Sequence, residues 1–273
     1  GKSALLVNIA ANMLGHPDGP IPVMIYSMEM EARKIANRML FAEAQVPLGI
    51  IYEPTKFTLA EKTALQLAKQ KLSDLPCIID ATPAMDINEL HMRAKRAKRK
   101  YGVEAIFVDY LQLMKNKAMK SRSKTEEVES ISNQLKQIAM ELEVAVVVLS
   151  QLNRNIESRE ADARRPQLSD LKASGAIEQD ADVILFIHRP EAIGTGVGDS
   201  TIPASSKEIT DLIVAKNRNG AVGEVRMRFR ERFTRFYDLG VPMQVSAVAS
   251  ATPVVCAPEK KVKTLDLDQL ETN

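Results

Sequence analysis

Short, continuously apolar runs alternate with longer amphipathic stretches up to about residue 190, and this alternation constrains the fold more than any other feature. The runs lie at Val23–Ser27, Cys77–Asp80, Ala105–Asp109, Val144–Ser150 and Asp182–His188. Strands that are covered on both faces of a parallel sheet have this uniformly apolar pattern. The sequence therefore predicts a mainly parallel sheet with helices on both sides.

Helical periodicity fills the intervals between the runs. In the clearest case, Thr125–Leu142, apolar residues recur at steps of three and four. The other predicted helices are Ser3–Leu14, Glu29–Ala44, Thr58–Ser73 and Asp86–Tyr101. Strands and helices that alternate in this way form right-handed crossovers, so the predicted fold class is α/β with a doubly wound sheet.

The pattern changes in the last third of the chain. Thr210–Ala215, Gly223–Arg230 and Thr234–Tyr237 are typical of consecutive strands, and Asn219-Gly220 between the first two indicates a hairpin. We therefore expect a C-terminal β-hairpin extension of the sheet.

Two segments lack a helical or strand period. Pro190–Ser206 is rich in Gly, Ser and Thr, and we expect a long exposed loop there. After Gly240 the chain is rich in Ala, Val, Ser and Pro and then charged, which predicts a disordered tail over residues 241–273. The predicted organisation is one domain over residues 1–240, followed by that tail.

Composition excludes several classes of protein. The formal charge is only +2, so the overall balance does not indicate a polyanion partner. Cys77 and Cys256 lie far apart, which argues against a disulfide scaffold and predicts a cytoplasmic protein. The three histidines are isolated, so we expect no zinc cluster. The longest apolar run, Val144–Leu149, is too short to cross a bilayer.

The chain starts with Gly1-Lys2-Ser3, and a helix-like run follows at once. Gly-Lys-Ser at the start of a helix is how a P-loop ends: backbone amides hold phosphates, the lysine adds a positive charge, and the hydroxyl binds Mg²⁺. A tripeptide is a short signal, and a chance match or a vector remnant explains it equally well.

Two carboxylates at predicted strand ends strengthen the nucleotide interpretation. Asp109 ends an apolar strand, as in a Walker B motif, where it would face the crevice and hold Mg²⁺. The alternative is an aspartate that caps the next turn, but Lys2 and Ser3 favour the metal. Glu29 could activate a water for attack on a phosphate, or it could only stabilise a helix dipole, and its position does not separate the two.

Five segments carry a family resemblance, namely YSMEM, IFVDYLQLM, VVVLSQLNR, LKASGAIEQDADVILFIHR and AKNRNGAVGEVRMRF, in this order. Together they resemble the C-terminal ATPase domain of the DnaB-type replicative DNA helicases, a branch of the RecA-like motors. The resemblance covers Gly1 to about Asp238 and is most specific at Asp109–Leu113 and Ser150–Arg154. It implies a RecA-like P-loop fold and an ATP-dependent DNA helicase.

The resemblance also implies roles in nucleotide binding. The residues that match the nucleotide-binding motifs are Gly1, Lys2, Ser3 and Asp109. Of these, Ser3 and Asp109 would hold Mg²⁺ beside ATP.

Catalytic roles follow from the same resemblance. Glu29 matches the catalytic base, and Gln151 matches the glutamine that senses the γ-phosphate. Lys216 and Arg218 match a basic pair that acts on the neighbouring subunit's nucleotide, where a cation would stabilise the charge that develops during phosphoryl transfer. The alternative for this pair is a hairpin with solvated basic residues.

Two segments are expected to contact DNA. Lys115–Lys124 contains basic residues and no acidic one, as suits a loop that follows phosphates without reading sequence. The family's second DNA loop matches Lys172–Gly175, although Ala173 departs from its usual pattern. The residues expected to bind DNA are Lys117, Lys120, Arg122, Lys172, Ser174 and Gly175.

The implied partners are single-stranded DNA, further copies of the chain in a homo-hexamer, primase and a helicase loader, with no membrane. Two alternatives stay open: a RecA-like recombinase or clock-type ATPase, and a non-catalytic truncated subunit. The Ser150–Arg154 segment and the Lys216–Gly220 hairpin favour the helicase.

The start of the chain matches a position inside the Walker A motif. The first glycine of the P-loop, its four variable residues and the strand before them have no counterpart in the sequence. Without that central strand, we expect two unpaired sheet edges in the middle of the fold. We also expect weak ATP binding by these 273 residues alone.

Overall fold

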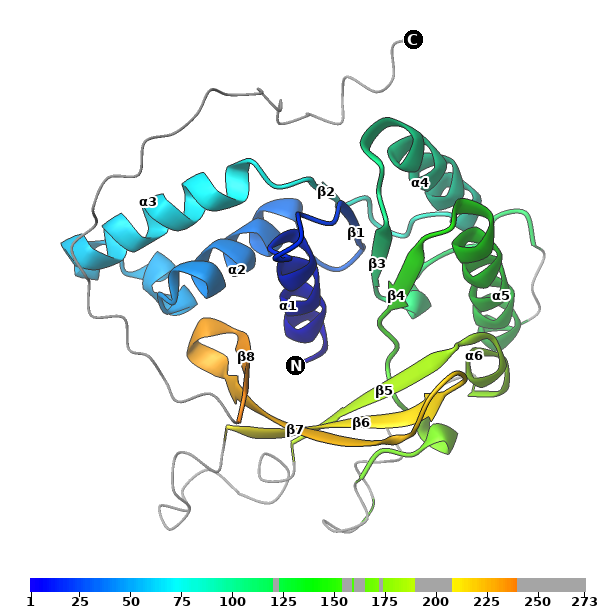
Figure 1. Ribbon diagram of the computed structural model, residues 1–273. Helices are drawn as coiled ribbons and strands as arrows, with labels where there is room; N and C mark the ends of the chain where they lie inside the picture. The colour runs from blue at the N-terminus through cyan, green and yellow to red at the C-terminus, as the bar shows by residue number, and fades with distance from the viewer. Residues whose placement is uncertain (120–122, 154–158, 160–164, 172–173, 190–207, 240–273) are drawn as a thin grey trace.

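A parallel sheet forms the centre of the first half of the chain (Figure 1). The computed structural model describes residues 1–119, 123–153, 159, 165–171, 174–189 and 208–239. In that part, four parallel strands pair in the order β2-β1-β3-β4. Their bounds are Val23–Ser27 for β1, Cys77–Asp80 for β2, Ala105–Asp109 for β3 and Ala145–Val148 for β4. Every residue of β1 and β3 is buried, which explains their uniformly apolar sequences.

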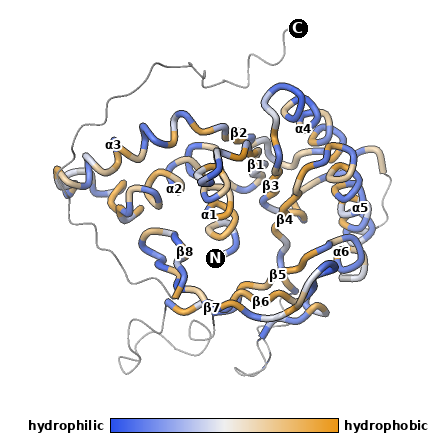
Figure 2. The backbone as a smooth tube through the Cα atoms, in the orientation of Figure 1, coloured by the Kyte–Doolittle hydropathy of each residue, from blue (hydrophilic) through white to orange (hydrophobic). Residues whose placement is uncertain are grey.

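Helices cover both faces of this sheet, as the alternating pattern predicts. The helices of one face are α4 (Ile87–Tyr101) and α5 (Lys124–Leu142), and those of the other face are α1 (Lys2–Leu14) and α2 (Ala32–Ala44). Helix α3 (Leu59–Ser73) packs on α2. Figure 2 shows the apolar strands in the middle of the layers, with hydrophilic residues along the outer sides of the helices.

A second, antiparallel sheet follows, in the order β5-β6-β7-β8. Its strands are Val183–His188 for β5, Ile209–Asn217 for β6, Gly223–Arg230 for β7 and Arg235–Asp238 for β8. The predicted hairpin of β6 and β7 is therefore present. The short helix α6 (Ser174–Asp180) precedes this sheet. Short 3-10 turns cover Leu48–Tyr52, Pro54–Lys56, Leu111–Leu113, Leu168–Asp170 and Glu231–Phe233.

The placement of β5 differs from the expectation. The run Asp182–His188 was expected in the parallel sheet, but β5 pairs antiparallel with β6. Its first four residues alternate between exposed and buried, as on a strand with one open face, and Val183 is 49% exposed while Ile184 is 7% exposed. An apolar run cannot by itself distinguish these two positions, because Val183 and Leu185 are apolar although they lie partly in solvent.

In the described part of the chain the first sheet has β2 and β4 as its edge strands, and the second has β5 and β8. Strand β4 pairs only with β3, and β5 pairs only with β6. This agrees with the expectation of two open edges between the parallel strands and the C-terminal strands.

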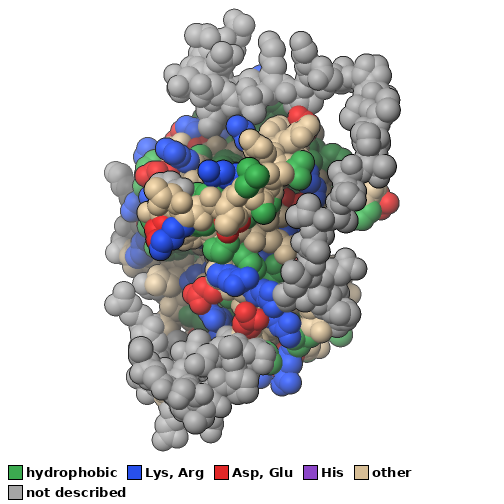
Figure 3. Space-filling model, turned by 90° about the vertical axis from the view of Figure 1, so that its left-hand side faces the viewer, with side chains coloured by type: hydrophobic (Ala, Val, Ile, Leu, Met, Phe, Trp, Pro, Cys, Tyr) green, Lys and Arg blue, Asp and Glu red, His purple; other side chains and the backbone are tan. Residues whose placement is uncertain are grey.

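The end of the second sheet is fixed to the helices of the first. The Asn8 side chain on α1 donates to the Thr234 carbonyl at 2.8 Å and accepts from the Phe236 amide at 3.1 Å. Arg235 donates to the Ala42 carbonyl at 3.0 Å and lies 3.6 Å from Glu43. Figure 3 shows the side of the molecule where α2, α3 and β8 lie, with acidic side chains among the basic ones, so no field of one sign covers it.

No helix in the described residues has the length and apolar character needed to span a bilayer. The expected loop Pro190–Ser206 and the expected tail at residues 241–273 lie outside the described residues.

Candidate active site

Three predicted site residues lie together at the carboxyl edge of the parallel sheet, and we call Lys2, Glu29 and Asp109 the nucleotide corner. Ser27 and Asp109 are neighbours in the register of β1 and β3, and the Met28 amide donates to the Asp109 carbonyl at 2.9 Å. Glu29 is the next residue, within the bend at residues 28–30 that follows β1. Lys2 is the first residue of α1, and both carboxylates act electrostatically on its ammonium group. The carboxyl edge of a parallel sheet is where such folds bind ligands.

The electrostatics of Lys2 suit an anionic ligand. Partial desolvation lowers the pKa of the Lys2 ammonium below its ordinary value, and the negative charges of Asp109 and Glu29 oppose that shift. A cation in this position gains from a further negative group such as a phosphate.

Asp109 has the chemistry of a magnesium ligand. The residue is only 5% exposed, and its carboxylate acts electrostatically on the Lys2 ammonium group. Mg²⁺ is bound through one or two oxygen side chains together with substrate phosphates and water. The Asp109 carboxylate and the Ser3 hydroxyl at the start of α1 are such oxygen donors, so the residues present fit this ion.

The start of α1 also lies close to the second sheet. The Gly1 carbonyl accepts the Leu5 amide at 3.0 Å, which starts the helix. A Cβ atom on Gly1 would lie 3.7 Å from Cγ2 of Ile187 on β5. Residues of the antiparallel sheet therefore border the nucleotide corner.

Two arginines that the sequence reasoning missed lie near this helix start. The charges of Arg189 and Arg38 act on the position of Gly1, with the charge of Glu231 acting in the opposite sense. The N-terminus of a helix already attracts anions through its dipole. Arg189 directly follows β5, and its place at a strand end could have predicted a role in the site. Arg38 lies inside a helix, and no sequence pattern distinguishes it from other surface arginines.

Gln151 lies just beyond the end of β4 and is exposed. Its backbone amide donates to the Gln112 side chain at 3.2 Å. It therefore joins the segment that follows Asp109, although no measured contact links Gln151 to Lys2 within the described residues.

Lys216 and Arg218, which we call the basic hairpin, lie at the other end of β5 from Gly1. Lys216 pairs with Ile184, and the Arg218 amide donates to the Asp182 carbonyl at 2.8 Å. The Arg218 guanidinium donates to the Asp182 carboxylate at 3.0 Å and to the Gln179 carbonyl at 2.9 Å. Lys216 donates to the Glu178 carbonyl. The structure thus separates this pair from the chain's own nucleotide corner.

The residues expected to contact DNA are only partly described. Lys117 is exposed, and Gly175 lies exposed in the first turn of α6. Lys120, Arg122, Lys172 and the side chain of Ser174 lie outside the described residues.

Comparison with known proteins gives a consistent result. The sequence model of the family described as "DnaB-like helicase C terminal domain" matches residues 1–238. The chain is 35% identical over 239 residues to the replicative DNA helicase DnaB of Geobacillus stearothermophilus, covering 88% of this chain and 50% of that protein. It is 36% identical over 239 residues to the replicative DNA helicase DnaC of Bacillus subtilis, with the same coverage. The chain thus spans about half the length of the curated relatives it matches.

Solved structures agree in fold. One of them, described as an ATPase domain, superimposes with a TM-score of 0.77 at 31% identity, covering 87% of this chain and 80% of that one. A DnaB-like replicative helicase, described together with its interactions with primase, gives a TM-score of 0.77 at 31% identity over 87% of this chain and 54% of that one. The RecA-like α/β fold expected from the sequence is confirmed.

Proposed function

The chain belongs to the family of DnaB-like helicase C-terminal domains, and from this premise we propose that it is the ATP-hydrolysing motor of a replicative DNA helicase. The observation that carries the proposal is the nucleotide corner. It places one cation and two carboxylates, from three separate elements, at the ligand-binding edge of a parallel sheet. Phosphoryl transfer needs this combination of charges.

The residues of the nucleotide corner, together with Ser3 and Gln151, then have the following proposed tasks. Lys2 contacts the β- and γ-phosphates, and Asp109 with the Ser3 hydroxyl holds Mg²⁺. When bound, Mg²⁺ neutralises the negative charge that the phosphates carry. Glu29 orients a water and accepts its proton, since it lies exposed directly beside the Asp109 bend. Gln151 contacts the γ-phosphate and responds to its loss.

We further propose that the chain works as a homo-hexamer in which Lys216 and Arg218 reach the neighbouring subunit's nucleotide. Their position at the far end of β5 from Gly1 supports this assignment. A cation supplied between subunits makes hydrolysis depend on assembly. The proposed domain spans residues 1–240 and works in the cytoplasm.

The proposed track is single-stranded DNA, held by its phosphates. The DNA-contacting residues are Lys117, Lys120, Arg122, Lys172, Ser174 and Gly175. Contacts of this kind give translocation without sequence preference. A structural relative is described with primase, and we propose primase and a helicase loader as partners here.

The proposal is tested by replacing Glu29 in the complete protein that contains this chain. Glu29→Gln keeps the size of the side chain but cannot accept the proton, so ATP turnover should fall by about 10²–10⁴-fold while nucleotide binding persists. The matched control is Glu31→Gln, whose carboxylate pairs with Lys34 on the surface of α2.

Steady-state ATP hydrolysis, nucleotide binding and unwinding of a forked duplex are measured for all three proteins. A wild-type protein that does not unwind DNA with ATP would overturn the function. A Glu29→Gln variant with normal turnover would overturn the role of that residue.

A further inference from the structure

The side chain of Gln112 joins two segments that the proposed mechanism treats separately. Its Oε1 accepts the Gln151 amide at 3.2 Å, and its Nε2 donates to the Ser150 hydroxyl at 2.8 Å. One residue earlier, the Leu111 amide donates to the Leu149 carbonyl at 2.9 Å. Three consecutive residues after β4 are therefore bonded to two consecutive residues after β3.

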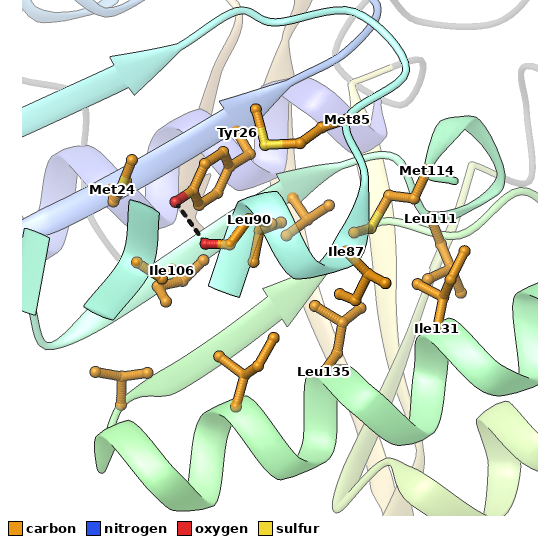
Figure 4. Packing of buried hydrophobic residues seen from close by; sticks show 14 of the residues in the cluster. Met24, Tyr26, Met85, Ile87, Leu90, Ile106, Leu111, Met114, Ile131 and Leu135 are labelled. Carbon is orange, nitrogen blue, oxygen red and sulfur yellow. Dashed lines mark hydrogen bonds between the residues drawn. The ribbon is translucent and has the colours of Figure 1, made fainter. Parts of the chain in front are cut away.

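The segment that continues from Gln112 is held firmly on its other side. Leu111 and Met114 are buried against Ile131 of α5 in the core cluster, which also contains Tyr26 and Leu90 (Figure 4). This packing fixes the short turn Leu111–Leu113 between the sheet and α5.

Polar contacts then fix the start of the basic segment Lys115–Lys124. The Lys115 amide donates to the Met85 carbonyl at 3.0 Å, and the Lys117 amide donates to the Asp86 carboxylate at 2.7 Å. The Asn116 amide donates to the Glu127 carboxylate at 3.1 Å. The side-chain hydrogen bond from Lys124 and, after it, the Asn116 amide lower the pKa of Glu127 against the effect of burial. Burial raises the pKa of Asp86, but the Lys117 amide and further hydrogen bonds lower it overall.

We propose that Gln112 is a positioning residue that couples the place of Gln151 to the start of the basic segment. This role rests on the proposed function, in which Gln151 follows the γ-phosphate and Lys117 follows DNA. Four residues lie between Gln112 and Lys117, and hydrogen bonds or core packing hold residues 114–117. A shift of the Ser150–Gln151 backbone would be transmitted by the Gln112 side chain to residues 113–117.

A charge-free replacement of similar size tests the coupling. Gln112→Leu removes both side-chain hydrogen bonds, whereas Gln112→Glu still accepts from the Gln151 amide and from the Ser150 hydroxyl. The matched control is Gln137→Leu, because Gln137 donates to Asn133 on the exposed side of α5, away from both segments. The three variants are compared in the complete protein that contains this chain.

The measurement is ATP turnover with and without oligo-dT. We expect the ratio of DNA-stimulated to basal turnover to fall about tenfold in Gln112→Leu, given the loss of two hydrogen bonds. It should stay within about twofold of wild type in Gln112→Glu and in Gln137→Leu. Amide hydrogen exchange at Asn116 and Lys117 should also accelerate in Gln112→Leu.

The outcomes separate the two proposals. A wild-type protein without DNA-stimulated turnover would overturn the proposed function and, with it, this role. Stimulated wild type together with an equally stimulated Gln112→Leu variant would overturn only the role of Gln112. An equal loss of basal and stimulated turnover in Gln112→Leu and Gln112→Glu would also reject it, because that result indicates a structural residue only.

Discussion

The charged side chains of the nucleotide corner and of the basic hairpin differ in their interactions within the chain. In the nucleotide corner, the buried residue Asp109 and the exposed Glu29 act on the Lys2 ammonium group through their charges. In the basic hairpin, Lys216 and Arg218 already donate to carbonyls at the end of α6 and to Asp182. The first site gathers charges of both signs at the ligand-binding edge of a sheet, whereas hydrogen bonds within one chain hold the cations of the second. This difference is what we expect if one site binds its own nucleotide and the other serves a neighbouring subunit.

The largest effect should come from Lys2→Ala in the complete protein. Removing the cation that acts on both Asp109 and Glu29 leaves two carboxylates facing the phosphates, so nucleotide binding, ATP turnover and unwinding should be lost together. Lys34→Ala on the surface of α2 serves as the control and should keep all three. Turnover that survives in Lys2→Ala would reject the P-loop assignment and with it the contrast between the two sites.

A smaller effect is expected for Arg218→Ala. Nucleotide binding should stay nearly intact, because the nucleotide corner is untouched, while turnover should fall by on the order of 10²–10³-fold. Mixing the variant with wild type should suppress activity more than in proportion to its share, since each variant subunit also disables a neighbour. Arg99→Ala, on the exposed side of α4, is the control. Normal hydrolysis by Arg218→Ala would show that the basic hairpin takes no part in hydrolysis.

The smallest effect is expected for Asp182→Asn. The Asp182 carboxylate accepts from Lys136 and Arg218, and these cations lower its pKa. Because the pair is half exposed, losing the charge should loosen Arg218 and reduce turnover only about two- to fivefold, without changing nucleotide affinity. Asp18→Asn, at a site that is 93% exposed, is the comparison. A loss as large as that of Arg218→Ala would mean that Asp182 takes part in the chemistry itself.

Local signals predicted most of the fold. The bounds of β1, β2, β3 and β7 agree with the predicted ranges, because buried parallel strands leave apolar runs and a hairpin leaves a turn signal between two strands. The sequence could not place β5, since its apolar run suits either sheet and its partner is set by tertiary packing. Propensity also put the start of α2 at Glu29, whereas the helix begins at Ala32 after a bend in which the Ser27 hydroxyl accepts the Met30 amide at 3.1 Å.

The site could be predicted only in part. Lys2, Glu29 and Asp109 each end or begin an element, so their meeting follows from the topology of a parallel sheet. Arg38 and Gln112 have no such mark, because their neighbours are residues far away in the sequence. The hydrogen bond from Arg218 to the Gln179 carbonyl of α6 also could not be predicted from the sequence, because every residue carries a backbone carbonyl.

Helix α6 has a mechanical consequence. Its seven residues form a helix about 10 Å long. Gly175 lies at one end, and the carbonyls that accept hydrogen bonds from Lys216 and Arg218 lie at the other. In the proposed hexamer, a phosphate of the neighbouring subunit that attracts Arg218 would shift the carbonyls at the end of α6. Because α6 is a helix, that shift would also displace Gly175 at its other end. The same helix would then connect the contact with the neighbouring nucleotide to the proposed contact with DNA.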